Sequence, residues 1–567
     1  MKFRHLNSKT ISFVVLYSIF YILYSGSASA DFLNQTVIFN LNPQYEYLSR
    51  TKVSATLRKI SSNAYWYVSD DFWAGVFEPE KNLFLEKLDE LALEFDNRIY
   101  PIERGFWGTE SNPGVDNDPK ITVLITKLID QAGGYFDTTH LYKKTEAPES
   151  NEREMFFINS SSVISDRAKV FLAHEFQHLI GFYQKEILKN ITEDVWLNET
   201  RAEYAPRLLG YDDVFDTSNI RRRIFAFQQN QSDPLAEWKN ESSDYGAVTL
   251  FMYYLVDNYG AQILVDSQKS AKSGIGSINE ALRQNLFSQT FSDVFSDWTI
   301  ANILNDSSVD QKYAYKSGHL SNFRVSPTQS YTISGIGTIF SVSNQSKDWQ
   351  PHWYEFNTLV GSSTGLNLKV DFSADMETNF RVPFIAFKIN GQKEISFLPL
   401  NGTSATFFFK NFGSEIYKIV LIPANHSKTS KFTENDPVVS FNLKVQLTSE
   451  FEELNASTPL PQISPATSIQ DLLDKISALQ NQIKQLQKST ISISLTRDLS
   501  IGSKGDDVGQ LQKFLINQGV YPEARISGYF GPLTKNAVIR FQKKYEIFPQ
   551  IGYVGPKTRN KILELAD

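Results

Sequence analysis

The chain has 567 residues, too many for one compact core, so several domains are expected. With 41% hydrophobic and 21% charged residues, its composition is that of a globular protein and argues against collagen, wholesale disorder or a polytopic membrane protein. The absence of cysteine excludes disulfides, thiolate zinc sites, iron–sulfur clusters and cysteine nucleophiles, so any metal must bind nitrogen and oxygen ligands. A formal charge of −7 argues against nucleic acid as the main partner.

Residues 1–30 have the pattern of a signal peptide. Basic residues precede an apolar run from Ile11 to Leu23, and the segment ends in Ala28-Ser29-Ala30. Because the run is shorter than the ~20 residues that a membrane span needs, cleavage near Ala30 is favoured over an uncleaved anchor. Cleavage would change the formal charge from −7 to −10. No other stretch is apolar enough to span a bilayer, so we expect a secreted or cell-wall-associated protein.

Residues 31–318 are predicted to form an α+β domain. Short β-rich runs such as 121–125 alternate with helical stretches at 165–181, 194–208 and 244–257. The sequence leaves open whether residues 31–59 are a removable pro-segment or the first strands of this domain.

Residues 319–450 are predicted to form an all-β sandwich. Helical periodicity disappears, and short apolar runs at 384–389, 405–409, 416–422 and 438–445 alternate with turns rich in Gly, Asn, Ser and Pro. The role of this domain stays open between carbohydrate binding, a cover over a cleft and a spacer.

Two connecting segments follow. Residues 451–468 are rich in Pro, Ser and Thr, which predicts an extended linker. In residues 469–489 apolar residues recur at spacings of three and four. This pattern fits a short coiled coil that would allow self-association, and it also fits a spacer helix docked on its neighbour.

A metal-binding motif lies in the predicted helix 165–181, which Ser165 and Asp166 are expected to start. His174-Glu175-Phe176-Gln177-His178 fits H-E-x-x-H. Residues at i and i+4 share one helix face, so both imidazoles can reach one zinc ion while Glu175 contacts water bound to it. The alternative is a pair of ordinary helix histidines.

Zinc needs a third protein ligand, and the sequence offers two patterns. Glu199, 21 positions after His178 in the stretch W-L-N-E, resembles the glutamate that a downstream helix supplies in gluzincin metallopeptidases. Gly181 instead continues the motif as H-E-x-x-H-x-x-G, the opening of the metzincin pattern. That pattern would place Gln184, a poor neutral zinc ligand, at the third position, so Glu199 is the predicted ligand.

Nearby residues have predicted supporting roles. Glu203 is either an alternative ligand or an acceptor that orients a histidine, and Asn198 helps to position the helix; the alternative is that both are ordinary surface residues. Zinc lowers the pKa of bound water to about 7, and Glu175 would take its proton and pass it to the leaving amine. Tyr245, in the stretch D-Y-G-A, resembles the transition-state stabiliser of gluzincin aminopeptidases; the alternative is a structural tyrosine.

The wider stretch from about residue 50 to 260 resembles the secreted, hyicolysin-like branch of zinc peptidases. The matching segments are A-Y-W-Y-V at 64–68, P-G-V-D-N-D-P at 113–119, G-G-Y-F at 133–136 and N-E-R-E-M at 151–155. The resemblance implies a zincin-like metallopeptidase fold. Absence of the aminopeptidase signature G-A-M-E-N favours an endopeptidase. A weak expectation is calcium at Asp116 and Asp118, since such a stretch is more often just a turn.

Residues 497–567 resemble the small three-helix peptidoglycan-binding domain. Two G-Y-x-G-P-x-T turns begin at Gly528 and Gly552, 24 residues apart, as an internal repeat. The segment has 11 basic and 7 acidic residues, and Tyr529 and Tyr553 could stack on sugar rings. The alternative is that these tyrosines merely cover the core.

Together these features predict an exported zinc endopeptidase that is held at the cell wall. Its expected partners are a protein or peptide substrate and peptidoglycan. Two other functions stay open: a hydrolase of peptidoglycan cross-links, and a noncatalytic surface adhesin on a peptidase fold.

Overall fold

The computed structural model describes residues 30–359, 365–449, 495–521, 526–545, 547 and 552–566. They belong to two compact units, Met1–Glu452 and Glu453–Asp567, and the chain is a multidomain protein of mixed α/β structure. The signal peptide, the linker 451–468 and the helix 469–489 lie outside the described residues. Within the described part, none of the helices combines the length and apolarity that crossing a membrane requires.

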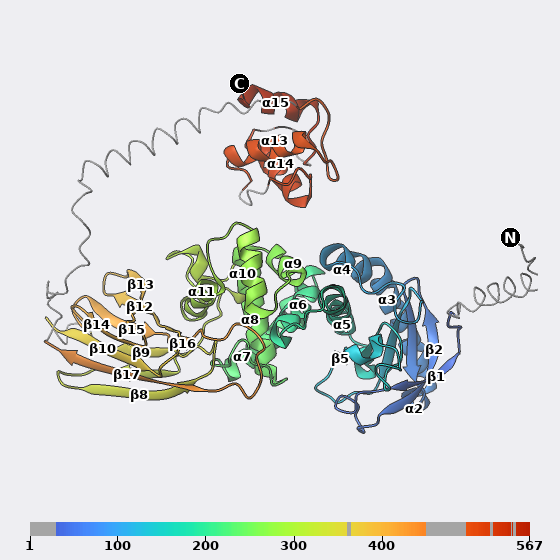
Figure 1. Cartoon of the computed structure of the whole chain (residues 1–567), viewed down its shortest axis with the longest axis horizontal. Coiled ribbons are helices and arrows are strands. Elements are labelled where there is room, and N and C mark those ends of the chain that lie inside the picture. Colours follow the sequence, from blue (N-terminus) through green and yellow to red (C-terminus); the bar gives the residue numbers. More distant parts are fainter. Residues whose placement is uncertain are drawn as a thin grey trace, which may run out of the picture. The chain divides into compact units, whose positions relative to one another are not determined.

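A mixed sheet forms one end of the first unit (Figure 1). Its order is β1-β2-β3-β4-β6-β5, and its strands are β1 (Thr36–Asn40), β2 (Lys52–Ile60), β3 (Ala64–Ser69), β4 (Ile121–Thr126), β5 (Gly134–Tyr135) and β6 (Met155–Asn159). Strands β3, β4 and β6 run parallel and are buried along their whole length, as expected for strands covered on both faces. Strand β5 pairs antiparallel with β6 and forms one edge of the sheet.

The stretch 31–59 contributes the first strands of this sheet. Strand β1 pairs with β2, and β2 with β3. The Asp31 carboxylate forms an ion pair with Arg153 and accepts a 2.8 Å hydrogen bond from the Tyr67 hydroxyl. The stretch is therefore an integral part of the folded unit.

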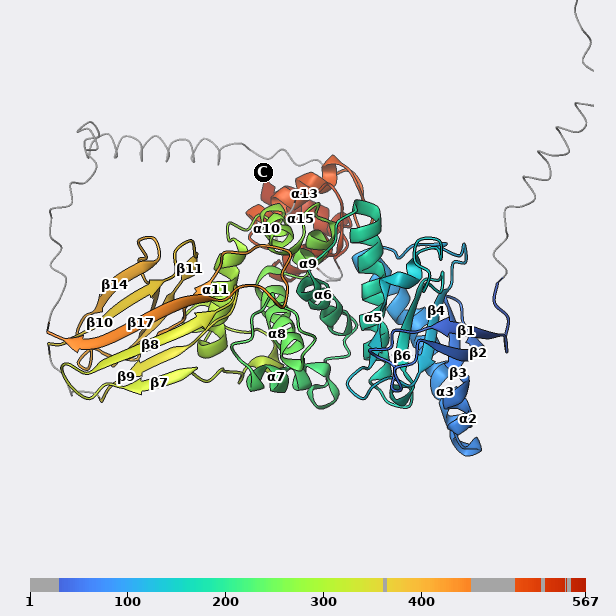
Figure 2. The same ribbon diagram turned by 60° about the horizontal axis from the view of Figure 1, so that its bottom comes forward.

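A helical layer lies between this sheet and a second β region (Figures 1 and 2). Its helices are α5 (Ala168–Phe182), α6 (Val195–Leu208), α7 (Asn219–Gln229), α8 (Ser242–Tyr259), α9 (Gln262–Lys269), α10 (Gly274–Gln284) and α11 (Phe291–Leu304). Near the sheet lie α2 (Asp70–Gly75), α3 (Glu78–Glu94) and α4 (Tyr100–Trp107). Short 3₁₀ turns are η2 (Thr138–Leu141), η3 (Ser160–Ser162), η5 (Phe215–Thr217), η6 (Gln311–Tyr313) and η7 (Gly318–Leu320).

The helices at 165–181, 194–208 and 244–257 are confirmed, with two differences in detail. Helix α5 begins at Ala168 and not at Ser165, because the Ser165 hydroxyl donates back to the Ser162 carbonyl in a turn and caps nothing. Helices α3 and α5 each continue into a π-helical segment, η1 (Phe95–Ile99) and η4 (Tyr183–Ile187).

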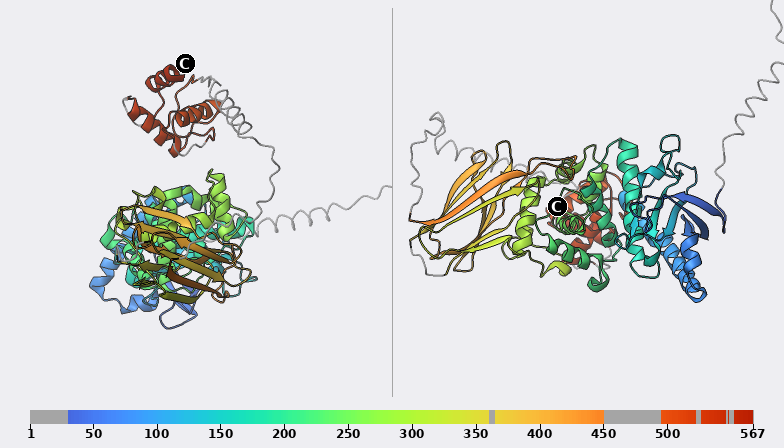
Figure 3. Two further views of the ribbon diagram at one scale, coloured as in Figure 1. Left: turned by 90° about the vertical axis from the view of Figure 1, so that its left-hand side faces the viewer. Right: turned by 90° about the horizontal axis from the view of Figure 1, so that it is seen from below.

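Two facing sheets enclose a second core (Figure 3). One has the order β14-β10-β17-β8 and the other β13-β12-β15-β9-β7, with a small β11–β16 pair beside them. The strands are β7 (Gln329–Thr332), β8 (Ile339–Ser346), β9 (Tyr354–Asn357), β10 (Asn367–Ala374), β11 (Phe380–Arg381), β12 (Pro383–Lys388), β13 (Lys393–Phe397), β14 (Ser404–Phe409), β15 (Ile416–Leu421), β16 (Ala424–Asn425) and β17 (Val439–Thr448). Four of them, β12, β14, β15 and β17, coincide with the predicted apolar runs.

This β region is fused to the helical layer through a shared core. Trp349 and Trp353 are fully buried in the same cluster as the helices, and the Trp353 indole donates to the Thr299 carbonyl of α11 at 3.0 Å. The Lys431 backbone N–H donates at 2.7 Å to Asp194, the residue before α6. Because these contacts are buried and specific, the β region is not a loose spacer.

The second unit holds α13 (Asp506–Asn517), α14 (Pro532–Lys544) and α15 (Pro556–Ala566). Its repeat is visible in the hydrogen bonds: Gln512 donates to the Tyr529 carbonyl and accepts from Gly528, while Gln542 donates to the Tyr553 carbonyl and accepts from Gly552. Helices α13 and α14 thus each hold one turn by a buried glutamine.

Candidate active site

Helix α5 carries both histidines of the motif on one face. The Nε2 atoms of His174 and His178 lie 3.1 Å apart, and both rings are partly buried. Two ring nitrogens facing each other at this distance are well arranged to share a cation. Helix α6 crosses beside α5 and brings the third group.

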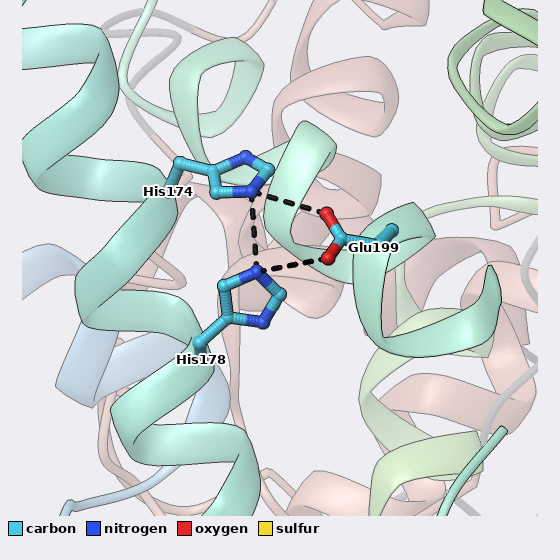
Figure 4. Close-up of side chains that lie close together, drawn as sticks. All are labelled: His174, His178 and Glu199. Atoms are coloured by element: carbon cyan, nitrogen blue, oxygen red, sulfur yellow. Dashed lines mark hydrogen bonds and ion pairs between the residues drawn. The ribbon is translucent and has the colours of Figure 1, made fainter. Parts of the chain in front are cut away.

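Glu199 of α6 lies against both imidazoles (Figure 4). Its Oε2 is 3.2 Å from Nε2 of His174, and its Oε1 is 3.5 Å from Nε2 of His178. Among the His, Cys, Asp and Glu side chains of the described residues, His174, His178 and Glu199 form the group whose donor atoms lie close enough together to hold a metal ion.

The three donors fit zinc. Bonds of about 2.0–2.1 Å in a tetrahedron hold ligand atoms about 3.3 Å apart. The two Nε2 atoms lie 3.1 Å apart, Glu199 Oε2 lies 3.2 Å from that of His174, and the other oxygen, Oε1, lies 3.5 Å from that of His178. One donor atom from each residue lies within 4.8 Å of the other two. Glu199 Oε2 is also buried and makes no hydrogen bond in the described structure, as expected for an atom that coordinates a metal. Two imidazoles and one carboxylate leave the fourth position of a tetrahedral ion for water.

The two glutamates of the site have pKa values shifted in opposite directions. Burial raises the pKa of Glu175 to about 8, although His178 opposes this. Burial would also raise the pKa of Glu199, but the adjacent His178 and His174 more than offset it and hold that pKa well below its usual range. Glu199 is thus suited to staying ionised, and Glu175 to exchanging a proton near neutral pH.

Glu203 supports the site from one turn further along α6. Its carboxylate lies 3.6 Å from Nδ1 of His174, on the side of the ring away from Glu199. It also pairs with Arg223 and accepts a 2.8 Å hydrogen bond from Thr249. An acceptor fixed in this way favours a proton on Nδ1 of His174 and leaves Nε2 free for a metal.

A cleft of about 750 Å³ opens over these residues. Edge strand β5 borders it, and a side chain on Gly134 would come within 2.9 Å of the Glu175 carboxylate. Tyr245 of α8 lines the cleft, and burial, followed by the charge of Glu199, raises its pKa well above the usual value. Its hydroxyl donates to Asn240 at 3.2 Å.

Tyr45, which sequence reasoning missed, also lines this cleft. Its ring stacks on Tyr135 of β5 at 4.8 Å, and burial and Glu199 raise its pKa. No local sequence motif marks Tyr45. It lies in the loop between β1 and β2, and the pairing of the strands brings this loop to the cleft.

The other sequence candidates lie as follows. Gln184 donates to the Thr109 carbonyl at 2.6 Å. Asn198 lines the cleft and accepts a long hydrogen bond from Arg201. Asp116 and Asp118 accept backbone hydrogen bonds within their turn, and calcium there stays a prediction.

Comparison with known proteins gives a family match within the second unit. Residues 504–562 match the family described as a putative peptidoglycan binding domain. The zinc D-Ala-D-Ala carboxypeptidase of Streptomyces albus G is 47% identical over 73 residues, which are 12% of this chain and 27% of that protein. The match therefore spans about a quarter of that relative's length.

Two solved structures share weak likeness. The pre-peptidase C-terminal domain of a collagenase from Bacillus anthracis is 13% identical, with 21% of this chain and 98% of that chain covered and a TM-score of 0.15. A 4-O-methyl-α-glucuronidase is 8% identical, with 59% and 52% covered and a TM-score of 0.13. Scores this low carry no argument about fold or function.

Proposed function

We propose that the chain is an exported zinc-dependent endopeptidase of the gluzincin, hyicolysin-like type, held at the cell wall by its C-terminal module. The observation that carries the proposal is the convergence of His174, His178 and Glu199 with Glu175 beside them in an open cleft. The peptidase family and the zincin-like fold rest on the sequence motifs.

In the proposed hydrolysis of a peptide bond, each residue of the cleft has a separate role. When bound, zinc supplies a Lewis acid that lowers the pKa of a coordinated water and polarises a carbonyl. The Glu175 carboxylate accepts a proton from the attacking water and delivers it to the leaving nitrogen. The Tyr245 hydroxyl donates a hydrogen bond to the oxygen on which negative charge develops.

Strand β5 provides a place for the substrate backbone. One of its edges pairs with β6, and the other borders the cleft beside Glu175. An extended peptide can add to such an edge through main-chain hydrogen bonds, which do not depend on the substrate sequence. This arrangement suits a peptide chain that passes through the site.

The C-terminal module supplies the proposed tether. Tyr529 and Tyr553, at equivalent turns of the repeat, keep 42% and 40% of their surface exposed, so they are free to stack on sugar rings. Open space of about 1070 Å³ adjoins Tyr529 and Lys504. The family match at 504–562 supports peptidoglycan as the partner.

A second candidate function is hydrolysis of peptide cross-links in peptidoglycan. The observation that favours it is the identity shared with a zinc D-Ala-D-Ala carboxypeptidase. Because that match covers 12% of the chain, it supports wall association more than a substrate. Incubation with casein and with isolated sacculi separates the two activities.

The decisive experiment is the Glu175→Gln variant of the full chain. We expect about one equivalent of zinc in both proteins, chelator-sensitive cleavage of casein by the wild type, and a loss of at least about 10³-fold in the variant, because the proton acceptor is gone. Glu86→Gln, an exposed change on α3, should leave activity intact. A protein without zinc and without an effect of Glu175→Gln would instead fit the noncatalytic adhesin.

A further inference from the structure

A second groove adjoins the proposed cleft. It offers about 2040 Å³ of open space between the start of α5, helix α7 and the start of α8. Its walls carry four arginines, Arg167, Arg221, Arg222 and Arg223, and three acidic residues, Asp166, Asp216 and Glu241, so the positive charges outnumber the negative ones by one.

Two of these arginines form no ion pair with a described residue. Arg221 forms an exposed ion pair with Asp216, and Arg223 pairs with Glu203. No ion pair or hydrogen bond joins the guanidinium of Arg167 or Arg222 to another described residue. Burial, with Arg223 nearby, also lowers the pKa of Arg167, so an anion beside it would be stabilising.

Helix α7 forms one wall of the groove, and its packing on α8 places this wall next to the proposed catalytic cleft. A side chain on Gly246 would come within 2.6 Å of the Phe227 backbone nitrogen, so α7 and α8 cross at very close range. This crossing sets the Arg223 guanidinium over the ring of Tyr245, 4.4 Å from its centroid. The groove therefore begins where the proposed oxyanion donor lies.

The start of helix α5 forms the opposite wall of the groove, and its packing places this wall next to strand β5. The Arg167 guanidinium lies 5.2 Å from the centroid of the Phe171 ring, one turn before His174. That ring packs so closely on Gly133 that an added Cβ would come within 2.3 Å of it. Gly133 immediately precedes β5, so Arg167 lies beside the end of β5 where the strand begins.

The other end of β5 has a different character. Phe136, which follows the strand, stacks on His178 at 6.2 Å and packs against Phe182. A peptide lying along β5 would thus have an aromatic surface on one side of the zinc ligands and arginines on the other.

We propose that the groove is a specificity subsite for acidic side chains of the peptide substrate, with Arg167 and Arg222 as the residues that select them. This inference rests on the proposed peptidase function and names the class of substrate. The unpaired guanidinium groups would bind Asp or Glu carboxylates on one side of the scissile bond.

The test uses the full zinc-loaded chain and matched fluorogenic peptides. Asp or its uncharged counterpart Asn is placed at each of three positions on either side of a cleavable bond. We expect the wild type to favour Asp over Asn in kcat/KM by about fivefold at positions on one side only, as two partly exposed ion pairs allow. The preference should fall to near unity in the double variant Arg167→Gln/Arg222→Gln and persist in Arg283→Gln, an exposed control on α10.

A binding measurement keeps this inference separate from the proposed function. The Asp and Asn peptides are titrated against Glu175→Gln, with and without the double change, by fluorescence anisotropy at low and high salt. Tighter binding of the Asp peptide that disappears with the arginines, or with salt, supports the subsite even if the wild type cleaves nothing. An Asp-to-Asn ratio that the double change leaves unaltered, in binding or in kcat/KM, overturns it.

Discussion

At the scale of single residues, we propose different roles for the two carboxylates beside His174: Glu199 as a metal ligand and Glu203 as the acceptor that orients the ring. The i, i+4 spacing makes a shared ion for His174 and His178 predictable from sequence, and the proximity of Glu199 agrees with that prediction. The sequence leaves Glu203 open between a metal ligand, an orienting acceptor and an ordinary surface residue, and its side chain is buried. Its contact with Nδ1 of His174, together with the Arg223 pair, favours support.

Replacing Glu203 should therefore weaken metal binding without removing a ligand. We expect Glu203→Gln to reduce zinc affinity by about 10–100-fold, measured by competition with a chromogenic chelator, because His174 loses its orienting acceptor. The variant also leaves the half-buried Arg223 unpaired and should unfold more easily by on the order of 3 kcal/mol.

Thr249→Val is the matched control, since it removes one hydrogen bond to Glu203 and keeps the charge. It should change zinc affinity much less than Glu203→Gln does. Equal zinc affinity in the wild type and Glu203→Gln would contradict the supporting role.

At the scale of elements, the close crossing of α7 and α8 sets the position of Tyr245. Gly246→Ala would place a methyl group within 2.6 Å of the Phe227 backbone nitrogen and 2.9 Å of the Arg223 carbonyl, which only a shift of the helices can relieve. We expect a loss of about 1–3 kcal/mol in the free energy of unfolding in urea, together with lower kcat.

Gly105→Ala is the matched control for this prediction. Gly105 lies inside α4, and nothing lies within 4 Å of an added Cβ. Because alanine favours a helix over glycine by up to about 1 kcal/mol, this change should leave stability equal or slightly higher. The crossing argument is wrong if both variants unfold at the same urea concentration as the wild type.

Long periodic elements could be predicted from sequence, and short ones created by tertiary contact could not. The helix bearing His174 and the strand near 438–445 show their period directly, and the strand near 384–389 is marked by a continuous apolar run. Strand β5 has two residues and exists because it pairs with β6. The cleft position of Tyr45 depends on the order of the whole sheet, which no local pattern encodes.

At the scale of the whole molecule, the β region and the helical layer fold as one unit. One buried histidine lies where the two meet: His426 packs against Trp349 and against Phe295 of α11. A second, His352, lies inside the β region beside Tyr354 and Phe441. Burial lowers the pKa of His426 to about 3 and that of His352 to about 4. Burial thus keeps both rings neutral in the folded chain. The free energy of unfolding therefore depends on pH.

His352 isolates this linkage, because both of its ring nitrogens are buried without a hydrogen-bond partner in the described structure. Above pH 6.5 the ring is neutral in the folded and unfolded states. Between pH 6.5 and about 4 only the unfolded chain takes up the proton, so this residue removes stability as the pH falls, by on the order of 3 kcal/mol in total. Below about pH 4 both states are protonated and the loss stops growing.

The variant His352→Leu removes this titration while keeping a side chain of similar size. Buried carboxyls with raised pKa values, such as Glu175, act in the opposite direction in both proteins, so the difference between them is the informative quantity. We measure the Tm of both proteins by calorimetry. The Tm of His352→Leu relative to that of the wild type should rise steadily as the pH falls from 6.5 to 4, and the difference should stay constant below pH 4. A difference in Tm that stays constant from pH 7 to 4 would mean that His352 is not held neutral by its burial.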